Sequence, residues 1–178
     1  GIGGVERYNE LKGYDNSQAI INLTKKVDDL SKRLYIQSKS FDDVYQMAKT
    51  KTERMTSLPA IMPLNKKHSR IVSGFGMRYH PILHYRRMHT GIDLVAKKGT
   101  PVYATGNGKI EVAGKGGSKY SGYGIVIVVN HGFGYKTLYA HLSKVNVKAG
   151  QTVKRGEKIG EVGNTGLSQA PHLHYEVI

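Results

Sequence analysis

Residues 124–142 read GIVIVVNHGFGYKTLYAHL. Two runs rich in β-branched and apolar residues, IVIVV and KTLYA, flank the glycine-containing segment HGFG. Runs of this kind joined by a short glycine turn are typical of two antiparallel strands. Because IVIVV is apolar at every position, both of its faces should be buried, and we expect it to be a central strand.

The same pattern extends from Ile71 to the end of the chain. Short apolar runs such as TPVYA, KIEVA and KIGEVG alternate with the glycine segments GFG, GNG, GYG and GNTG. This alternation predicts an antiparallel β domain over residues 71–178. Within it, GKGGSKYSGYG has the composition of a long hairpin loop.

Residues 16–55 show a helical pattern instead. Asn16 or Ser17 can cap the helix, and Ser40 followed by Asp43 predicts a break near residues 38–40. The apolar positions alternate spacings of three and four over roughly four heptads: Ile20, Leu23, Val27, Leu30, Leu34, Phe41 and Val44. Two interpretations stay open: one amphipathic helix packing on its own domain, or a coiled coil that pairs with a partner, as in a dimer through residues 16–55.

The remaining boundaries follow from composition. Residues 1–15 form an N-terminal tail, and residues 56–70, which contain Pro59 and Pro63, are predicted to be a linker. Gly1 in place of methionine indicates a processed start, so an export signal or membrane anchor could have preceded it.

Composition narrows the functional classes. The 178 residues include no cysteine, which excludes disulfides and thiolate metal sites. The formal net charge of +14 attracts polyanions. Because the basic residues are spread along the chain, we expect a solvated basic surface and no nucleic-acid partner. No apolar run approaches the length of a membrane span.

The candidate chemistry lies in histidines. The chain ends in PHLHYEVI, where His172 and His174 would share one face of a strand. His89 and Asp93, four residues apart, can also converge in an extended segment. His89, Asp93 and one of the two histidines of HLH would supply two imidazoles and one carboxylate. That is the composition of a catalytic zinc site with an open fourth position. His141, after the run TLYA, is a fifth candidate.

Four further histidines are assigned to the surface or to hydrogen bonding: His68, His80, His84 and His131.

The segments SGFGMRYHP, HTGIDL, GTPVYAT, LYAHL, VKRGEKIG, VGNTG and APHLHYEV resemble the lysostaphin/LytM family of zinc metallopeptidases in order and spacing. The resemblance covers residues 71–178. It implies a mainly β fold, an antiparallel sheet and barrel-sandwich hybrid, behind the N-terminal helix. It also implies one Zn²⁺ per chain, bound by His89, Asp93 and His174, with His141 and His172 as catalytic residues. Which of these two is the general base stays open.

Family members cleave peptide bonds in peptidoglycan cross-links or stem peptides, and a basic protein suits that anionic polymer. The expected location is the cell envelope, periplasmic or extracellular, with a membrane anchor upstream of the chain. Relatives commonly continue beyond the HYEV strand into a short closing segment, whereas this sequence stops at Ile178, and whether the chain is truncated there stays open.

Three rival interpretations remain. Non-haem iron oxygenases also use two histidines and a carboxylate, but usually with HxD spacing, whereas this chain has HxxxD. A peptidoglycan-binding or hydrolase-activating module would not need an intact ligand set. A lipoyl-like or phosphotransfer carrier domain would leave five site residues unexplained.

Overall fold

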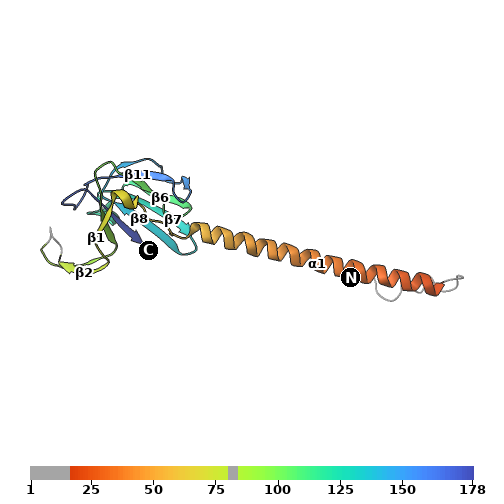
Figure 1. The fold of residues 1–178 in the computed structure, drawn as a ribbon. Helices are drawn as coiled ribbons and strands as arrows, with labels where there is room; N and C mark the ends of the chain where they lie inside the picture. Colours follow the sequence, from red (N-terminus) through yellow and green to blue (C-terminus); the bar gives the residue numbers. More distant parts are fainter. Residues whose placement is uncertain (1–16, 80–83) are drawn as a thin grey trace. The chain divides into compact units, whose positions relative to one another are not determined.

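The computed structural model describes residues 17–79 and 84–178. One α-helix precedes a series of short strands in these residues (Figure 1). The elements are α1 Ser17–Ser57, η2 Lys66–His68, β1 Arg70–Ser73, β2 Gly76–Tyr79, β3 Arg86–His89, β4 Ile92–Val95, β5 Pro101–Tyr103, β6 Gly108–Lys115, η3 Ser118–Tyr120, β7 Ile125–Gly132, β8 Tyr135–Ala140, β9 Leu142–Val145, β10 Thr152–Val153, β11 Lys158–Val162 and β12 His172–Val177.

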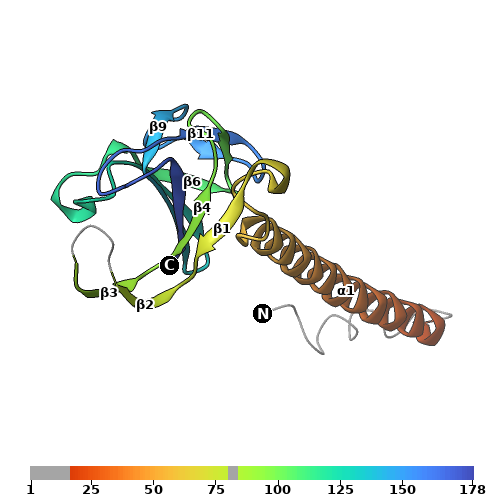
Figure 2. The same cartoon turned by 60° about the vertical axis from the view of Figure 1, so that its left-hand side comes forward.

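The strands form antiparallel sheets. Seven strands make one sheet in the order β1-β4-β12-β8-β7-β6-β10, and three make a second in the order β5-β11-β9. Strands β2 and β3 form a separate two-stranded ribbon. In Figure 2, β9 and β11 lie over the larger sheet, and the β2–β3 ribbon follows from β1. The predicted fold class is confirmed: the chain has one N-terminal helix followed by a mainly antiparallel β domain with sandwich-like sheets. These sheets do not close into a barrel.

The prediction of a central, doubly buried strand is also confirmed. Strand β7 lies between β8 and β6. Ile127 and Val129 belong to the main core, which includes residues of both the seven-stranded and the three-stranded sheet. Val126 and Val128 point to the opposite face, where they pack with Leu138 and other residues in a second cluster. Alternation along one strand therefore supplies two cores.

Helix α1 is continuous from Ser17 to Ser57. The predicted break near residues 38–40 is therefore wrong. The reason is that residues 17–57 contain neither glycine nor proline, and a serine inside a helix costs little compared with those two residues. The predicted tail at 1–15, Asn16 and the side chain of Ser17 fall outside the residues described.

Of the predicted linker, residues 58–65 connect α1 to η2 and lie against the β domain. The backbone N–H of Ala60 donates to the carbonyl oxygen of Thr105 at 3.1 Å, and that of Tyr103 donates to Pro63 at 2.9 Å. Leu64 is only 2% exposed and belongs to the main core. Residues 52–178 form one compact unit. The structure thus differs from the linker prediction, because local sequence does not reveal that Leu64 fills a core position.

This packing gives a stability prediction. Leu64→Ala should lower the free energy of unfolding by about 2–5 kcal/mol, because it removes buried apolar volume and leaves a cavity. Ile61→Ala is the matched control: Ile61 is 41% exposed, so its truncation should cost less than about 1 kcal/mol. Urea denaturation of the two variants measures both values. Equal small losses would show that the segment is not part of the domain.

None of the helices in residues 17–79 and 84–178 is both long and apolar enough to cross a membrane.

Candidate active site

Three strands bring the predicted ligand residues together. His174 on β12 lies directly opposite Asp93 on β4, and directly opposed residues share a face of the sheet. His89 ends β3, and two residues separate it from the start of β4. Gly91 lies between them, where a side chain would overlap the carbonyl oxygen of Tyr175. Glycine therefore permits the close approach that brings His89 to the other two residues.

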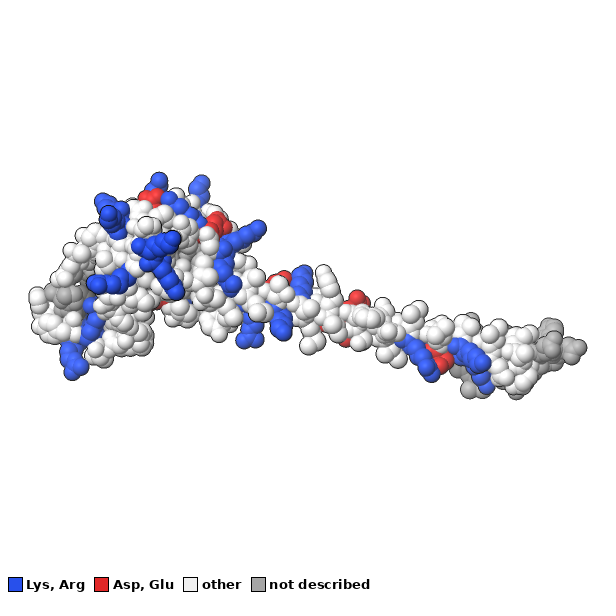
Figure 3. Space-filling view, viewed as in Figure 1, with Lys and Arg blue, Asp and Glu red and all other residues white. Residues whose placement is uncertain are grey.

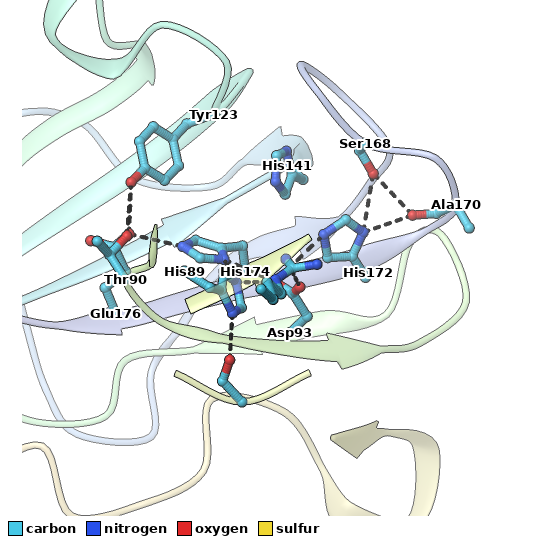
Figure 4. A network of polar contacts seen from close by, with 12 residues as sticks. His89, Thr90, Asp93, Tyr123, His141, Ser168, Ala170, His172, His174 and Glu176 are labelled. Atoms are coloured by element: carbon cyan, nitrogen blue, oxygen red, sulfur yellow. Dashed lines mark hydrogen bonds and ion pairs between the residues drawn. The ribbon is translucent and has the colours of Figure 1, made fainter. Parts of the chain in front are cut away.

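The three side chains converge on one point, as Figure 4 shows. His89 Nε2 lies 3.0 Å from His174 Nδ1 and 3.1 Å from Asp93 Oδ1. His174 Nδ1 lies 2.8 Å from Asp93 Oδ1. All three residues are buried, and their ligand atoms lie within 4.8 Å of one another. These are the three residues that the family resemblance implies as zinc ligands.

Hydrogen bonds on the far side of each ring fix which nitrogen faces the centre. His89 Nδ1 donates to the carbonyl oxygen of Gly74 at 2.6 Å, since a carbonyl can only accept. His174 Nε2 lies 2.9 Å from Glu176 Oε1 and donates to that carboxylate. In their neutral forms, both rings then present a lone pair to the centre. Two lone pairs and a carboxylate oxygen at such distances fit a divalent cation.

Charges around the centre support this assignment. Arg78 Nη2 donates to Asp93 Oδ2 at 2.8 Å and leaves Oδ1 to face the imidazoles. Burial alone would raise the pKa of Asp93, but His174 and His89 outweigh it and lower the pKa to about 2. Asp93 is therefore ionised at neutral pH. Burial would lower the pKa of His174, whereas Asp93 and Glu176 raise it, so a metal competes with a proton there.

His141 and His172 lie beside this centre. Their ring centroids are 4.7 Å apart, and the His141 ring is 6.0 Å from that of His174. His172 Nε2 is 3.8 Å from Asp93 Oδ1. His172 Nδ1 donates to the carbonyl oxygen of Ala170 at 2.8 Å. The structure therefore brings all five predicted site residues into one cleft.

His141 is held by an unusual backbone. Its φ of 60° lies in the left-handed region, which is strained for a side chain of this size. Its backbone N–H donates to the backbone carbonyl oxygen of Tyr123 at 2.9 Å, and its Nδ1 donates to the carbonyl oxygen of Thr165 at 2.7 Å. Burial lowers its pKa to about 4 against the opposing effect of the Thr165 bond. His141 is thus neutral at pH 7, with Nε2 available as an acceptor.

Sequence reasoning missed Glu176. Its Oε1 accepts hydrogen bonds from Thr90 Oγ1, from Tyr123 OH at 2.7 Å and from His174 Nε2. Burial would raise the pKa of Glu176, but these bonds outweigh it and keep the pKa below its usual range. The signal was present in the sequence, because residues 172, 174 and 176 alternate along one strand and share a face.

The other histidines are elsewhere. His131 is buried and hydrogen-bonds through both nitrogens, to Asn107 at 2.7 Å and to Thr137 at 2.8 Å. His68 and His84 are exposed. His80 lies outside the described residues. The assignment of His68, His84 and His131 to the surface or to hydrogen bonding is therefore confirmed.

The five residues line a cleft of about 240 Å³. The ribbon contributes Arg78 and Arg87, and the loop before β7 contributes Tyr123. The segment GKGGSKYSGYG does join the hairpin strands β6 and β7, as predicted. It also supplies one wall of the site.

The sequence from 87 to 178, about half of the chain, matches peptidase family M23. The chain belongs to peptidase family M23. As an M23 chain it is 51% identical over 109 residues to the DD-carboxypeptidase/endopeptidase Mpg of Neisseria meningitidis, and 44% identical over 117 residues to the peptidoglycan DD-endopeptidase ShyB of Vibrio cholerae. These alignments cover 61% and 65% of this chain, but only 24% and 26% of the relatives. The chain thus spans about a quarter of their length.

Solved M23 structures share the fold. A zinc-containing peptidase from Vibrio cholerae superimposes with a TM-score of 0.59 at 44% identity, covering 65% of this chain and 35% of that one. The catalytic domain of lysostaphin from Staphylococcus simulans gives a TM-score of 0.54 at 39% identity, covering 63% and 80%. The resemblance stated from the sequence is confirmed.

Proposed function

We propose that this M23 domain is a zinc-dependent endopeptidase that hydrolyses peptide bonds in peptidoglycan cross-links or stem peptides. In this proposal His89, Asp93 and His174 hold one Zn²⁺. His141 and His172 are the catalytic residues, with the general base left open between them. The names of the relatives above support the substrate class.

One observation carries the proposal: the convergence of His89 Nε2, His174 Nδ1 and Asp93 Oδ1 within a cleft that two more imidazoles line. A structural zinc site is usually closed by four protein ligands, whereas three ligands leave a position open for catalysis. The extra imidazoles favour hydrolysis over iron-dependent oxygenation and over a carrier function.

Zinc at this centre would supply Lewis acidity, which polarises a carbonyl group and makes water nucleophilic near neutral pH. The protein's own groups would move the protons. His172 and His141 each donate Nδ1–H to a backbone carbonyl, so each keeps Nε2 free as an acceptor. A neutral imidazole that has taken a proton can then give it to the leaving amine.

The surface charge agrees with an anionic substrate. Figure 3 shows many lysine and arginine side chains, with few acidic ones between them, over the visible face of the β domain. The net charge of +14 favours association with a polymer that carries carboxylates and phosphates. We place the protein in the cell envelope, periplasmic or extracellular, with a membrane anchor upstream as part of the same proposal.

The test is digestion of purified peptidoglycan by the metal-loaded chain, with and without chelator, followed by mass identification of the released peptides. We expect cleavage that chelation stops and that added zinc restores. The alternative, a non-catalytic peptidoglycan-binding or hydrolase-activating module, predicts sedimentation with peptidoglycan but no released peptide under any metal condition.

Glu176→Gln should weaken zinc binding by about 10- to 100-fold, because the carboxylate that orients His174 loses its charge while its shape is kept. Glu111→Gln is the matched control, since Glu111 is a surface carboxylate paired with Lys136. Competition with a chromophoric chelator measures both affinities. If the two variants bind zinc equally well, Glu176 does not support the metal site.

We also propose that α1 pairs with a second copy of the chain. The apolar residues spaced three and four apart along α1 are solvent-exposed. Their exposed fractions lie between 42% and 68% for Ile20, Leu23, Val27, Leu30, Leu34, Phe41 and Val44. Ile20 and Val27 occupy a positions, and Leu23 and Leu30 occupy d positions. This is the distribution that favours parallel two-stranded coiled coils.

The charged residues beside these apolar positions favour a parallel over an antiparallel pair. The g positions include Lys26 and Arg33. In an antiparallel pair, g positions of one helix lie beside g positions of the other, so these positive charges would repel each other. In a parallel pair they meet e positions such as Ser31 and Ser38, which are uncharged. The parallel arrangement therefore avoids repulsion.

Because the chain has no cysteine, single cysteines report this contact cleanly. Leu30→Cys, at the seam of a parallel dimer, should form a disulfide-linked dimer under mild oxidation. Lys32→Cys, on the outer face, should not. Light scattering gives the mass of the unmodified chain. A monomeric mass, or equal cross-linking of both variants, would contradict the dimer.

A further inference from the structure

Two arginines face each other across the β2–β3 ribbon. Arg78 on β2 pairs directly with Arg87 on β3, so both side chains leave the same face of the ribbon, and both line the cleft. Like charges in directly opposed positions destabilise a strand pair. A placement that costs stability is expected where the charges have a use at a functional site.

Among the described residues, only one of these two arginines has an ion-pair partner. Arg78 forms the ion pair with Asp93, at 2.8 Å. Arg87 is exposed, and within residues 17–79 and 84–178 it has no hydrogen-bond or ion-pair partner. Asp93 is the only carboxylate among the described residues that line the cleft, and Arg78 already occupies one of its oxygens. Arg87 therefore presents a positive charge in the cleft that no described residue pairs with.

The surroundings of Arg87 favour a planar anion. Tyr123 lines the same cleft as Arg87. The hydroxyl of Tyr123 is already committed to Glu176, so it does not compete for the guanidinium. A guanidinium presents two parallel N–H donors that match the two oxygens of a carboxylate.

We propose that Arg87 binds a carboxylate of the peptide substrate next to the scissile bond, and so selects peptides that carry a free carboxylate there. This inference rests on the proposed peptidase function and adds the chemical class that the site prefers. The carboxylate is either the C-terminal one of the peptide or a side-chain one, and both have the same chemistry.

Arg86 supplies a matched control. It precedes Arg87 on β3, and successive residues of a strand point to opposite faces. Arg86 is also an exposed arginine, but it does not line the cleft. Arg86→Gln and Arg87→Gln therefore remove the same charge from adjacent positions, and only the second removes it from the cleft.

The experiment uses the full zinc-loaded chain and synthetic copies of the cross-linked peptide that the peptidoglycan digest releases. One copy keeps all carboxylates, one has only its C-terminal carboxylate amidated, and one has only its side-chain carboxylates amidated. Cleavage kinetics and calorimetric binding are measured for the wild type, Arg86→Gln, Arg87→Gln and Arg87→Lys.

We expect one of the two amidations to lower kcat/KM of the wild type by about tenfold, mainly through KM. The amidation that has this effect shows whether Arg87 binds the C-terminal or a side-chain carboxylate. Arg87→Gln should show the same loss with the unmodified peptide and no further loss on amidation. Arg86→Gln should behave like the wild type. Arg87→Lys should recover part of the binding, because it keeps the charge but not the bidentate geometry. The difference in kcat/KM between the wild type and Arg87→Gln on the unmodified peptide should shrink with added salt.

The outcomes separate the two proposals. Binding that depends on a carboxylate and on Arg87, without any cleavage, would reject the peptidase function and keep the role of Arg87 as an anion-binding residue. Cleavage of all three peptides at one rate by the wild type and by Arg87→Gln would reject the role of Arg87 and keep the peptidase function. Binding of none of the peptides would reject the role of Arg87.

Discussion

Asp93→Ala should abolish zinc binding and peptidoglycan cleavage together. The substitution removes one of three ligand atoms and the only negative charge among them, leaving two imidazoles to hold a dication. It also frees Arg78, whose positive charge then repels the metal. Metal content of the dialysed protein and the rate of peptide release are the two measurements, with circular dichroism to verify the fold.

The control for this variant is Arg78→Gln, which breaks the same ion pair but keeps the ligand oxygen. We expect it to retain stoichiometric zinc. If Asp93→Ala also retains stoichiometric zinc, the assignment of Asp93 as a ligand is wrong. If both variants lose the metal equally, the ion pair rather than the ligand atom holds the site together.

His172→Ala should keep the zinc and lose most of the turnover. The His172 side chain lies in the cleft, and its Nε2, 3.8 Å from Asp93 Oδ1, is not one of the converging ligand atoms. Removing a general acid or base typically lowers a rate by about 10²–10⁴-fold. The measurement is kcat per bound zinc, which separates loss of chemistry from loss of metal.

His68→Ala is the matched histidine control, since His68 is exposed on η2 and does not line the cleft. It should cleave at the wild-type rate. His141→Ala should resemble His172→Ala, with an added loss of stability because His141 is buried and doubly hydrogen-bonded. Near-normal turnover by His172→Ala would exclude it from catalysis, and loss of zinc would make it a ligand.

The predictable parts of this protein were those written in local pattern. The uninterrupted apolar run IVIVV predicted a strand buried on both faces, and β7 is that strand. The spacing of three and four predicted the helix that runs from Ser17 to Ser57. The motifs HxxxD and HLH named four of the five residues that the structure brings into one cleft, and YAH named the fifth.

Other features were not predictable from local pattern. Leu64 follows a proline-containing stretch that has the composition of a linker, yet it fills a core position against strands distant in sequence. Glu176 lies in a strand whose alternation was visible, but its role depends on Thr90 and Tyr123, which are 86 and 53 residues away. Arg78 meets Asp93 because the chain folds back between them.

The sequence by itself determined the strands, the helix, the residue types of a metal site and which side chains share a strand face. These depend on backbone periodicity and side-chain chemistry, and both act over a few residues. Only the tertiary structure decided that His174 lies opposite Asp93, that Glu176 orients His174 and that Arg87 lines the cleft with no ion-pair partner among the described residues. The physical reason is that strand register and the packing of sheets join residues far apart in the chain, and local periodicity carries no information about that distance.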